Sequence, residues 1–127
     1  TNFTFTTTII NCLLFFTRFT VVFDALRQKL TTFSYSEKRA DSSRYFEGVI
    51  DGCQRQEVCA CLEQFLGKPV WPSSVTLPED VEKAIEDLGG VWENQTLYFS
   101  GNSSSAVFAM LWPWSDGKHI TVKAGVK

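Results

Sequence analysis

The chain has 127 residues, of which 44% are hydrophobic and 20% are charged, and its formal net charge at pH 7 is −2. Such a composition is typical of one folded domain with its own core, and it is too apolar for a disordered chain. The weakly acidic balance argues against binding to nucleic acid, and no apolar run of the sequence, residues 12–16 included, is long enough to span a membrane.

The N-terminal third predicts one strand and one long helix. In residues 3–10, Phe3, Phe5, Thr7 and Ile9 alternate with Thr4, Thr6, Thr8 and Ile10, and most of these side chains are β-branched. This pattern predicts a strand with one apolar face. Residues 12–33 carry apolar side chains at three- and four-residue steps, which predicts an amphipathic helix. The apolar stripe consists of Cys12, Phe15, Phe16, Phe19, Val22, Phe23, Leu26, Leu30 and Phe33. Because burial of each such side chain contributes about 1.5–3 kcal/mol, we expect this helix to be the main contributor to the core.

Residues 37–65 carry two more apolar stripes at helical spacing. The first consists of Tyr45, Phe46, Val49, Ile50 and Cys53, and the second of Val58, Cys61, Leu62 and Phe65. The two stripes are out of phase across Gly52, and glycine commonly ends a helix. We therefore predict two helices that meet at Gly52, the second of which ends at Gly67 before Pro69.

A loop over residues 68–75 precedes a short helix over residues 77–88. Thr76 and Glu79 form a capping box with a proline between them, which is a specific signal for the start of a helix. The buried stripe of this helix is Val81, Ala84, Ile85 and Leu88. Gly89-Gly90 is expected to end it.

After Gly90 the apolar period changes to two, which predicts three strands over 96–99, 106–112 and 119–123. The strand over 106–112 is apolar on both faces and should lie inside a sheet, whereas 119–123 alternates like a half-exposed strand. Asp116-Gly117 predicts a two-residue hairpin. We therefore expect a single α+β domain over residues 1–127, with an N-terminal strand and with three to four helices packed on one face of an antiparallel sheet of three to four strands.

The cysteines do not have the spacing of a metal site. Cys59 and Cys61 are two residues apart in a predicted helix, which turns their sulfurs to roughly opposite faces. Zinc usually needs four ligands in closely spaced pairs, so we interpret these thiols as small apolar side chains and assign no metal or cofactor. The low cysteine density favours a cytoplasmic protein, while three Asn-x-Ser/Thr triplets, at Asn2, Asn94 and Asn102, leave secretion open.

His119 is the single histidine of the chain. A general base needs an acid or a substrate within hydrogen-bond reach, and Glu93 and Asp116 are the two candidate acids. Neither lies in a known catalytic motif, and the chain has no recognisable nucleophile, zinc-protease or phosphate-binding motif. We interpret His119 as an exposed residue at the end of a strand, and we assign no catalytic residue.

Two groups of side chains remain as binding candidates. The four tryptophans Trp71, Trp92, Trp112 and Trp114 are suited to a contact surface or a pocket, above all Trp112 and Trp114 around Pro113 at a sheet margin. Plain packing over the open ends of the sheet is the simpler explanation. The helix over 77–88 is strongly acidic, and its last-turn acids Glu86 and Asp87 lie at the unfavourable end of the helix dipole. This suggests a basic partner, although a solvated helix face explains the charge about as often.

These features give a primary interpretation and two alternatives. The primary one is a non-catalytic interaction or regulatory protein that contacts a basic protein partner through Glu79, Glu82, Glu86 and Asp87 and through the tryptophan margin. The first alternative is a small-molecule-binding domain or small enzyme with an aromatic pocket between the long helix and the sheet, formed by Trp92, Tyr98, Trp112, Trp114 and His119. The second alternative is a homodimer joined through the 3–10 strand or the 119–123 strand.

Overall fold

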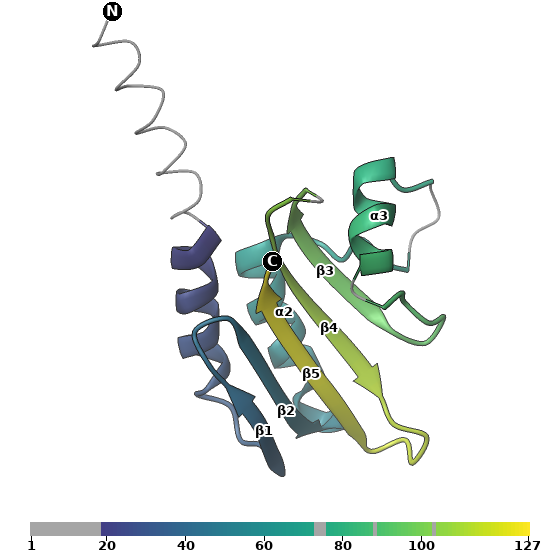
Figure 1. Cartoon of the computed structure of the whole chain (residues 1–127). Coiled ribbons are helices and arrows are strands. Elements are labelled where there is room, and N and C mark those ends of the chain that lie inside the picture. The colour runs from purple at the N-terminus through teal and green to yellow at the C-terminus, as the bar shows by residue number, and fades with distance from the viewer. Residues whose placement is uncertain (1–18, 73–75, 88, 103) are drawn as a thin grey trace, which may run out of the picture.

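In the part of the chain that a computed structural model describes, three helices pack against a five-stranded antiparallel sheet (Figure 1). The structure describes residues 19–72, 76–87, 89–102 and 104–127, so the predicted strand over 3–10 lies outside the described residues. The first described element is a helix over residues 19–30. It is followed by β1 (Glu37–Asp41), β2 (Tyr45–Asp51), a 3₁₀ turn (Gly52–Gln54), α2 (Arg55–Leu66), α3 (Glu79–Asp87), β3 (Thr96–Gly101), β4 (Ala106–Pro113) and β5 (His119–Val126).

The strand order is β1-β2-β5-β4-β3, and every neighbouring pair is antiparallel. The β1-β2 hairpin and the β3-β4-β5 meander are therefore joined where β2 pairs with β5. β4 is an interior strand, as predicted. The prediction that residues 119–123 form a half-exposed strand is wrong, because Ile120, Thr121 and Val122 are buried and β5 is the central strand with partners on both sides. That strand has no free edge through which a homodimer could form.

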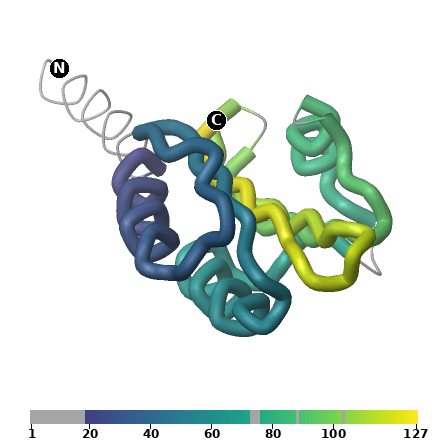
Figure 2. Tube along the Cα trace, turned by 90° about the horizontal axis from the view of Figure 1, so that it is seen from below, coloured from purple at the N-terminus to yellow at the C-terminus, as the bar shows by residue number. Residues whose placement is uncertain are grey.

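The helices lie on both faces of the sheet, which corrects the prediction that they share one. The larger core cluster joins the helix over 19–30 and α2 to side chains such as Phe46, Tyr98 and Val122. The smaller cluster joins α3 to Leu97 and Phe99. Since successive strand residues point to opposite faces, the assignment of Tyr98 to one cluster and of its two neighbours to the other places α3 on the far side. Figure 2 shows the helix over 19–30 next to α2, with α3 apart from both.

The apolar stripe of the first described helix is confirmed. Phe23, Leu26 and Leu30 are fully buried, and Phe19, Val22 and Phe33 pack against the same cluster. The helix is linked to the β1 end by Arg27, whose guanidinium lies 3.3 Å from Asp41. Its helical part ends at residue 30 and is followed by a turn, so Phe33 extends the stripe without belonging to the helix.

The prediction of a helix over residues 37–51 is wrong, because this segment forms the β1-β2 hairpin. Phe46 and Ile50 are fully buried against the helices, while Val49 is 1% exposed and points to the opposite face. A strand that is covered on both faces places apolar residues next to one another, and over a few residues this pattern resembles a helical stripe. The predicted break at Gly52 is correct, since the 3₁₀ turn starts there.

Glycines end the two later helices as predicted. The Gly67 N–H donates to Glu63 O at 2.9 Å after α2, and Gly90 N donates to Ile85 O at 2.8 Å after α3. The turn between β4 and β5 is longer than predicted, since it covers residues 114–118. No helix in the described ranges combines the length and the apolar character that a bilayer crossing requires.

Candidate functional site

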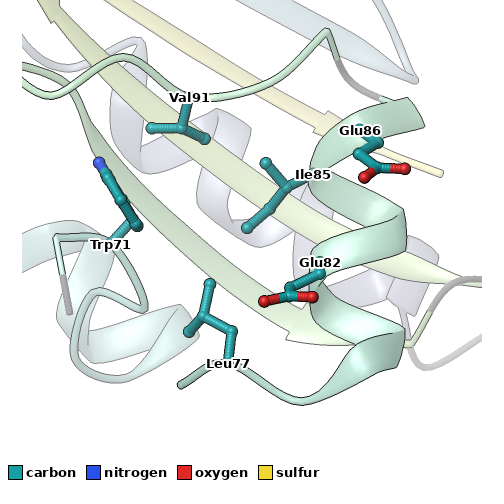
Figure 3. A pocket seen from close by; sticks show the side chains of 6 residues that line it. All are labelled: Trp71, Leu77, Glu82, Ile85, Glu86 and Val91. Atoms are coloured by element: carbon teal, nitrogen blue, oxygen red, sulfur yellow. The ribbon is translucent and has the colours of Figure 1, made fainter. Parts of the chain in front are cut away.

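A groove lies between α3 and the segments on either side of it, and we call it the α3 groove. It has a volume of about 350 Å³ and is lined by Trp71, Leu77, Glu82, Ile85, Glu86 and Val91. In Figure 3 the four apolar side chains converge from α3 and from the flanking segments, and the Glu82 carboxylate lies at their border. All four apolar residues are half-buried, so each keeps part of its surface open to a ligand.

The groove is fixed to the edge of the sheet through Trp71. This residue forms an isolated antiparallel bridge with Leu97 of β3, in which Leu97 N donates to Trp71 O at 3.0 Å. Its indole Nε1 donates to Trp92 O at 3.2 Å, and Trp92 N in turn donates to the Gln95 side chain at 2.9 Å. The Trp92 residue itself is 71% exposed and does not line the groove.

The charge of α3 faces solvent and is only partly neutralised. Its nine residues include five carboxylates and one lysine. Lys127 Nζ lies 2.8 Å from Asp87 Oδ2, which lowers the pKa of that carboxyl and accounts for an acid at the C-terminal end of the helix. Glu79, Glu82 and Glu86 have no cationic partner within 4.0 Å in the described part of the chain. The negative charge that is open to a partner therefore lies at the border of the α3 groove.

A second hollow lies at the end of the sheet where the β4–β5 turn meets the start of α2, and we call it the His119 pocket. Its volume is about 300 Å³, and it is lined by Gly52, Arg55, Pro113, Trp114, Gly117, Lys118, His119 and Ile120. The Trp114 indole Nε1 donates to Thr121 Oγ1 at 2.8 Å, and its ring lies 4.9 Å from the His119 ring. Trp114 is therefore held as a wall of this pocket.

Asp116 fixes the histidine of this pocket. Its Oδ1 accepts the backbone N–H of Lys118 at 2.9 Å and that of His119 at 3.0 Å, and its Oδ2 lies 2.5 Å from His119 Nδ1. The contact with the imidazole and these backbone donors lower the pKa of Asp116 to about 2. On the neighbouring strand, Asp51 accepts Cys53 N at 3.2 Å, and that hydrogen bond, with smaller contributions from the charges of His119 and Lys118, lowers its pKa.

The structure separates the residues of the predicted aromatic pocket. Tyr98 is 2% exposed inside the larger cluster, on the face opposite to α3. Trp112 packs against the smaller cluster, with Lys123 Nζ 3.6 Å from its ring centroid. Trp114 and His119 share the His119 pocket, whereas Trp92 lies beside the α3 groove. The space between the described part of the long helix and the sheet is the core itself.

Several residues of both sites were missed from the sequence. Leu77 and Val91 belong to loops without a period, and Arg55 and Lys118 belong to no motif, whereas Trp71 was one of the four tryptophans considered for a pocket or a contact surface. The sequence nevertheless contains two signals for these sites. The loop over 68–75 contains an apolar tryptophan that other residues must shield from water, and Lys118 directly precedes the single histidine.

The cysteines of the described residues are free thiols. Cys53 is exposed, Cys59 is half-buried and Cys61 is 7% exposed within the core. Burial raises the pKa of the Cys61 thiol. The part of the chain that the structure describes has no group of three or more metal-ligating side chains.

Comparison with known proteins gives no relative from which a role can be transferred. The chain matches no protein-family model, no curated protein and no solved structure.

Proposed function

We propose that this protein is a binding module that holds a short segment of a partner protein in the α3 groove. The single observation that carries this proposal is the combination, in one groove, of an apolar lining with unpaired carboxylates at its border. The segment it would take carries an aliphatic or aromatic side chain flanked by lysine or arginine. This refines the interpretation from the sequence of an interaction protein with an acidic contact helix.

The apolar part of the groove supports a docking role. Trp71, Ile85 and Val91 are half-buried, and Trp92 next to them is 71% exposed. Tryptophan is enriched among the residues that dominate binding energy at protein interfaces, particularly where an apolar side chain enters a pocket. The hydration of exposed apolar surface is unfavourable in free energy, and a bound apolar side chain would displace that water.

The charge supports a basic segment as the occupant. Glu82 and Glu86 are exposed, and only Lys83 among the side chains of α3 has the opposite sign. A lysine or arginine beside the bound apolar residue would lie close to these carboxylates, and an acidic segment would be repelled. Because the carboxylates are exposed, this attraction should weaken as the salt concentration rises.

An NMR titration with two synthetic peptides tests the proposal. One peptide alternates leucine and lysine, and in the second glutamate replaces each lysine. We expect the lysine peptide to shift the backbone amides of Ile85 and Val91 and the indole N–H of Trp71, and the glutamate peptide to leave them unchanged. Glu82→Lys combined with Glu86→Lys should weaken the binding of the lysine peptide by about tenfold or more.

The matched control applies the same change of charge elsewhere. Glu57 and Glu63 are exposed on α2, which covers the opposite face of the sheet. Glu57→Lys combined with Glu63→Lys should leave the affinity for the lysine peptide within about twofold of the wild-type value. It changes the net charge as much as the groove variant does, so any effect of net charge on the association rate is the same in both. Equal binding of both peptides, or equal loss in the two double variants, would show that the α3 groove is not the contact.

A further inference from the structure

We propose that the His119 pocket binds a small organic anion, whose carboxylate or phosphate group lies beside Arg55 and Lys118 and whose apolar part lies against Trp114. The pocket shares no lining residue with the α3 groove. This proposal is therefore independent of the proposed function, and each can fail without the other.

Two cations in the pocket have no carboxylate partner. In the described part of the chain, no Asp or Glu oxygen lies within 4.0 Å of the charged nitrogens of Arg55 or Lys118. Arg55 is half-buried, and its guanidinium donates to Thr96 Oγ1 at 3.4 Å. A partly desolvated guanidinium retains donors that match a carboxylate or a phosphate in a forked arrangement. The unpaired Arg55 is thus the main anchor for the anionic group.

The acids nearby are already engaged in local structure. Asp116 accepts two backbone N–H groups and contacts His119 Nδ1, and Asp51 accepts Cys53 N at the cap of the 3₁₀ turn. The charges of Lys118 and His119 contribute to the lowered pKa of Asp51, so the Asp51 carboxylate in turn reduces the positive potential of these two side chains in the pocket. Neither carboxylate contacts the guanidinium of Arg55 at the first turn of α2, and the N-terminal end of that helix adds positive potential.

His119 and Trp114 supply the rest of the site. Because Asp116 contacts Nδ1, Nε2 is the ring nitrogen of His119 that remains for a ligand. The indole of Trp114 is fixed by its hydrogen bond to Thr121, and its ring contacts the His119 ring and lies 5.7 Å from Arg39 Cζ. The residue is still 37% exposed, so part of its apolar ring remains open to a ligand. A volume of about 300 Å³ is at the lower end of the range for small-molecule sites, which fits a compact ligand with one ring or a short chain.

Ligand-induced changes in NMR spectra of the full chain provide the test, with phenyl phosphate, benzoate, inorganic phosphate and neutral benzyl alcohol as probes. We expect phenyl phosphate or benzoate, or both, to shift the imidazole resonances of His119 and the indole N–H of Trp114, and benzyl alcohol to shift neither. Arg55→Gln should weaken binding by about tenfold or more, since a charge-assisted hydrogen bond is lost. Lys118→Gln, at an exposed position, provides a second variant that should weaken binding if Arg55→Gln impairs folding.

Arg44→Gln is the matched control, because Arg44 is exposed outside the pocket. It should leave binding unchanged. Binding of both organic anions supports a general anion site, and binding of one identifies the preferred group. The proposal is overturned if neither organic anion binds, if only inorganic phosphate binds, if benzyl alcohol binds equally well, or if Arg44→Gln weakens binding as much as the pocket variants do.

Discussion

Asp116 holds His119 at two points, since its Oδ1 accepts the His119 backbone N–H at 3.0 Å and its Oδ2 lies 2.5 Å from His119 Nδ1. Asp116 is one of the two acids that the sequence suggested as partners for the histidine, and the structure brings these two residues together. The same contacts tie the turn over 114–118 to the start of β5. The pair therefore combines a structural role in the turn with control over which nitrogen of the imidazole is available.

The pH dependence of stability follows from the pKa of Asp116, which is lowered from 3.8 to about 2. The ionised form is favoured in the folded protein, so its contribution to stability is complete above the unfolded pKa and is lost as the pH falls through the folded value. We expect Asp116→Asn to lower the melting temperature at neutral pH, and this difference from wild type to shrink between about pH 4 and pH 2. Thermal unfolding followed by circular dichroism across this range checks the prediction.

His119→Gln serves as the companion variant. It removes the contact with Nδ1, which is the largest cause of the lowered pKa, and leaves both backbone donors in place. Part of the pH dependence should therefore remain. A difference between Asp116→Asn and wild type that is undiminished at pH 2 would contradict the assignment.

The helix over 19–30 can be tested by truncation of one buried and one exposed side chain. Leu26 is fully buried in the larger cluster, whereas Val21 on the same helix is 58% exposed. We expect Leu26→Ala to reduce the free energy of unfolding by about 2–5 kcal/mol, because it leaves a cavity in the core. Val21→Ala should change it by no more than about 0.5 kcal/mol. Urea denaturation measures both, and similar losses in the two variants would mean that this helix is not packed as described.

The helices that the sequence predicted correctly are those in which one face is buried. The helix over 19–30, α2 and α3 each have one apolar side, so the 3.6-residue period is visible in their sequences. β2 is different, because Val49 and Ile50 are both buried on opposite faces of the sheet. Its neighbour β1 is a charged edge strand, Glu37–Asp41, and shows no apolar period at all. Neither pattern distinguishes a strand from a helix without knowledge of what packs against it.

Close packing of Tyr35 against β2 gives a sharp prediction at Gly48. A Cβ atom at this position would lie 2.7 Å from Tyr35 Cδ1, and the Tyr35 hydroxyl is anchored to Leu30 O at 2.5 Å. We expect Gly48→Ala to reduce the free energy of unfolding by about 1–3 kcal/mol, as in other overpacked cores. Urea denaturation provides the measurement.

A double-mutant cycle isolates this contact. Tyr35→Leu removes the ring that the new methyl group would meet, so the loss in the combined variant should be clearly smaller than the sum of the two single losses. Simple additivity would show that the ring of Tyr35 is not the cause.

The candidate sites were less predictable than the fold because they combine residues distant in the sequence. Glu82 and Glu86 were identified from the charge of α3, but the apolar lining of the groove comes largely from Trp71, Leu77 and Val91 in separate loops. Trp112 and Trp114 lie two residues apart, yet one packs near α3 and the other beside His119. The pairing of β4 with β5 was predicted from the Asp116-Gly117 turn, but the pairing of β2 with β5 and the bridge of Trp71 to Leu97 join segments far apart in the sequence. No local pattern encodes these two contacts.

The thiol of Cys53 gives a chemical test of the region where β2 meets α2. Cys53 is exposed, but the hydrogen bond to the Asp51 side chain and the negative charge of Asp51 raise its pKa. Since alkylating reagents react with the thiolate, removal of that charge should speed the reaction. We expect Asp51→Asn, which keeps an acceptor for the helix cap, to raise the rate of Cys53 alkylation by iodoacetamide severalfold at mildly alkaline pH. Peptide mass spectrometry at timed intervals identifies the modified cysteine.

The buried Cys61 is the internal reference for this measurement. It is 7% exposed and its pKa is raised by burial, so its slow alkylation should not respond to Asp51→Asn. Asp24→Asn removes a carboxylate from the helix over 19–30, away from Cys53, and should leave both rates unchanged. Faster alkylation of Cys61 in the Asp51 variant would mean that the substitution opens the core, and the effect on Cys53 could then not be assigned to the lost charge. A Cys53 rate that does not change would contradict the proposed influence of Asp51 on the thiol.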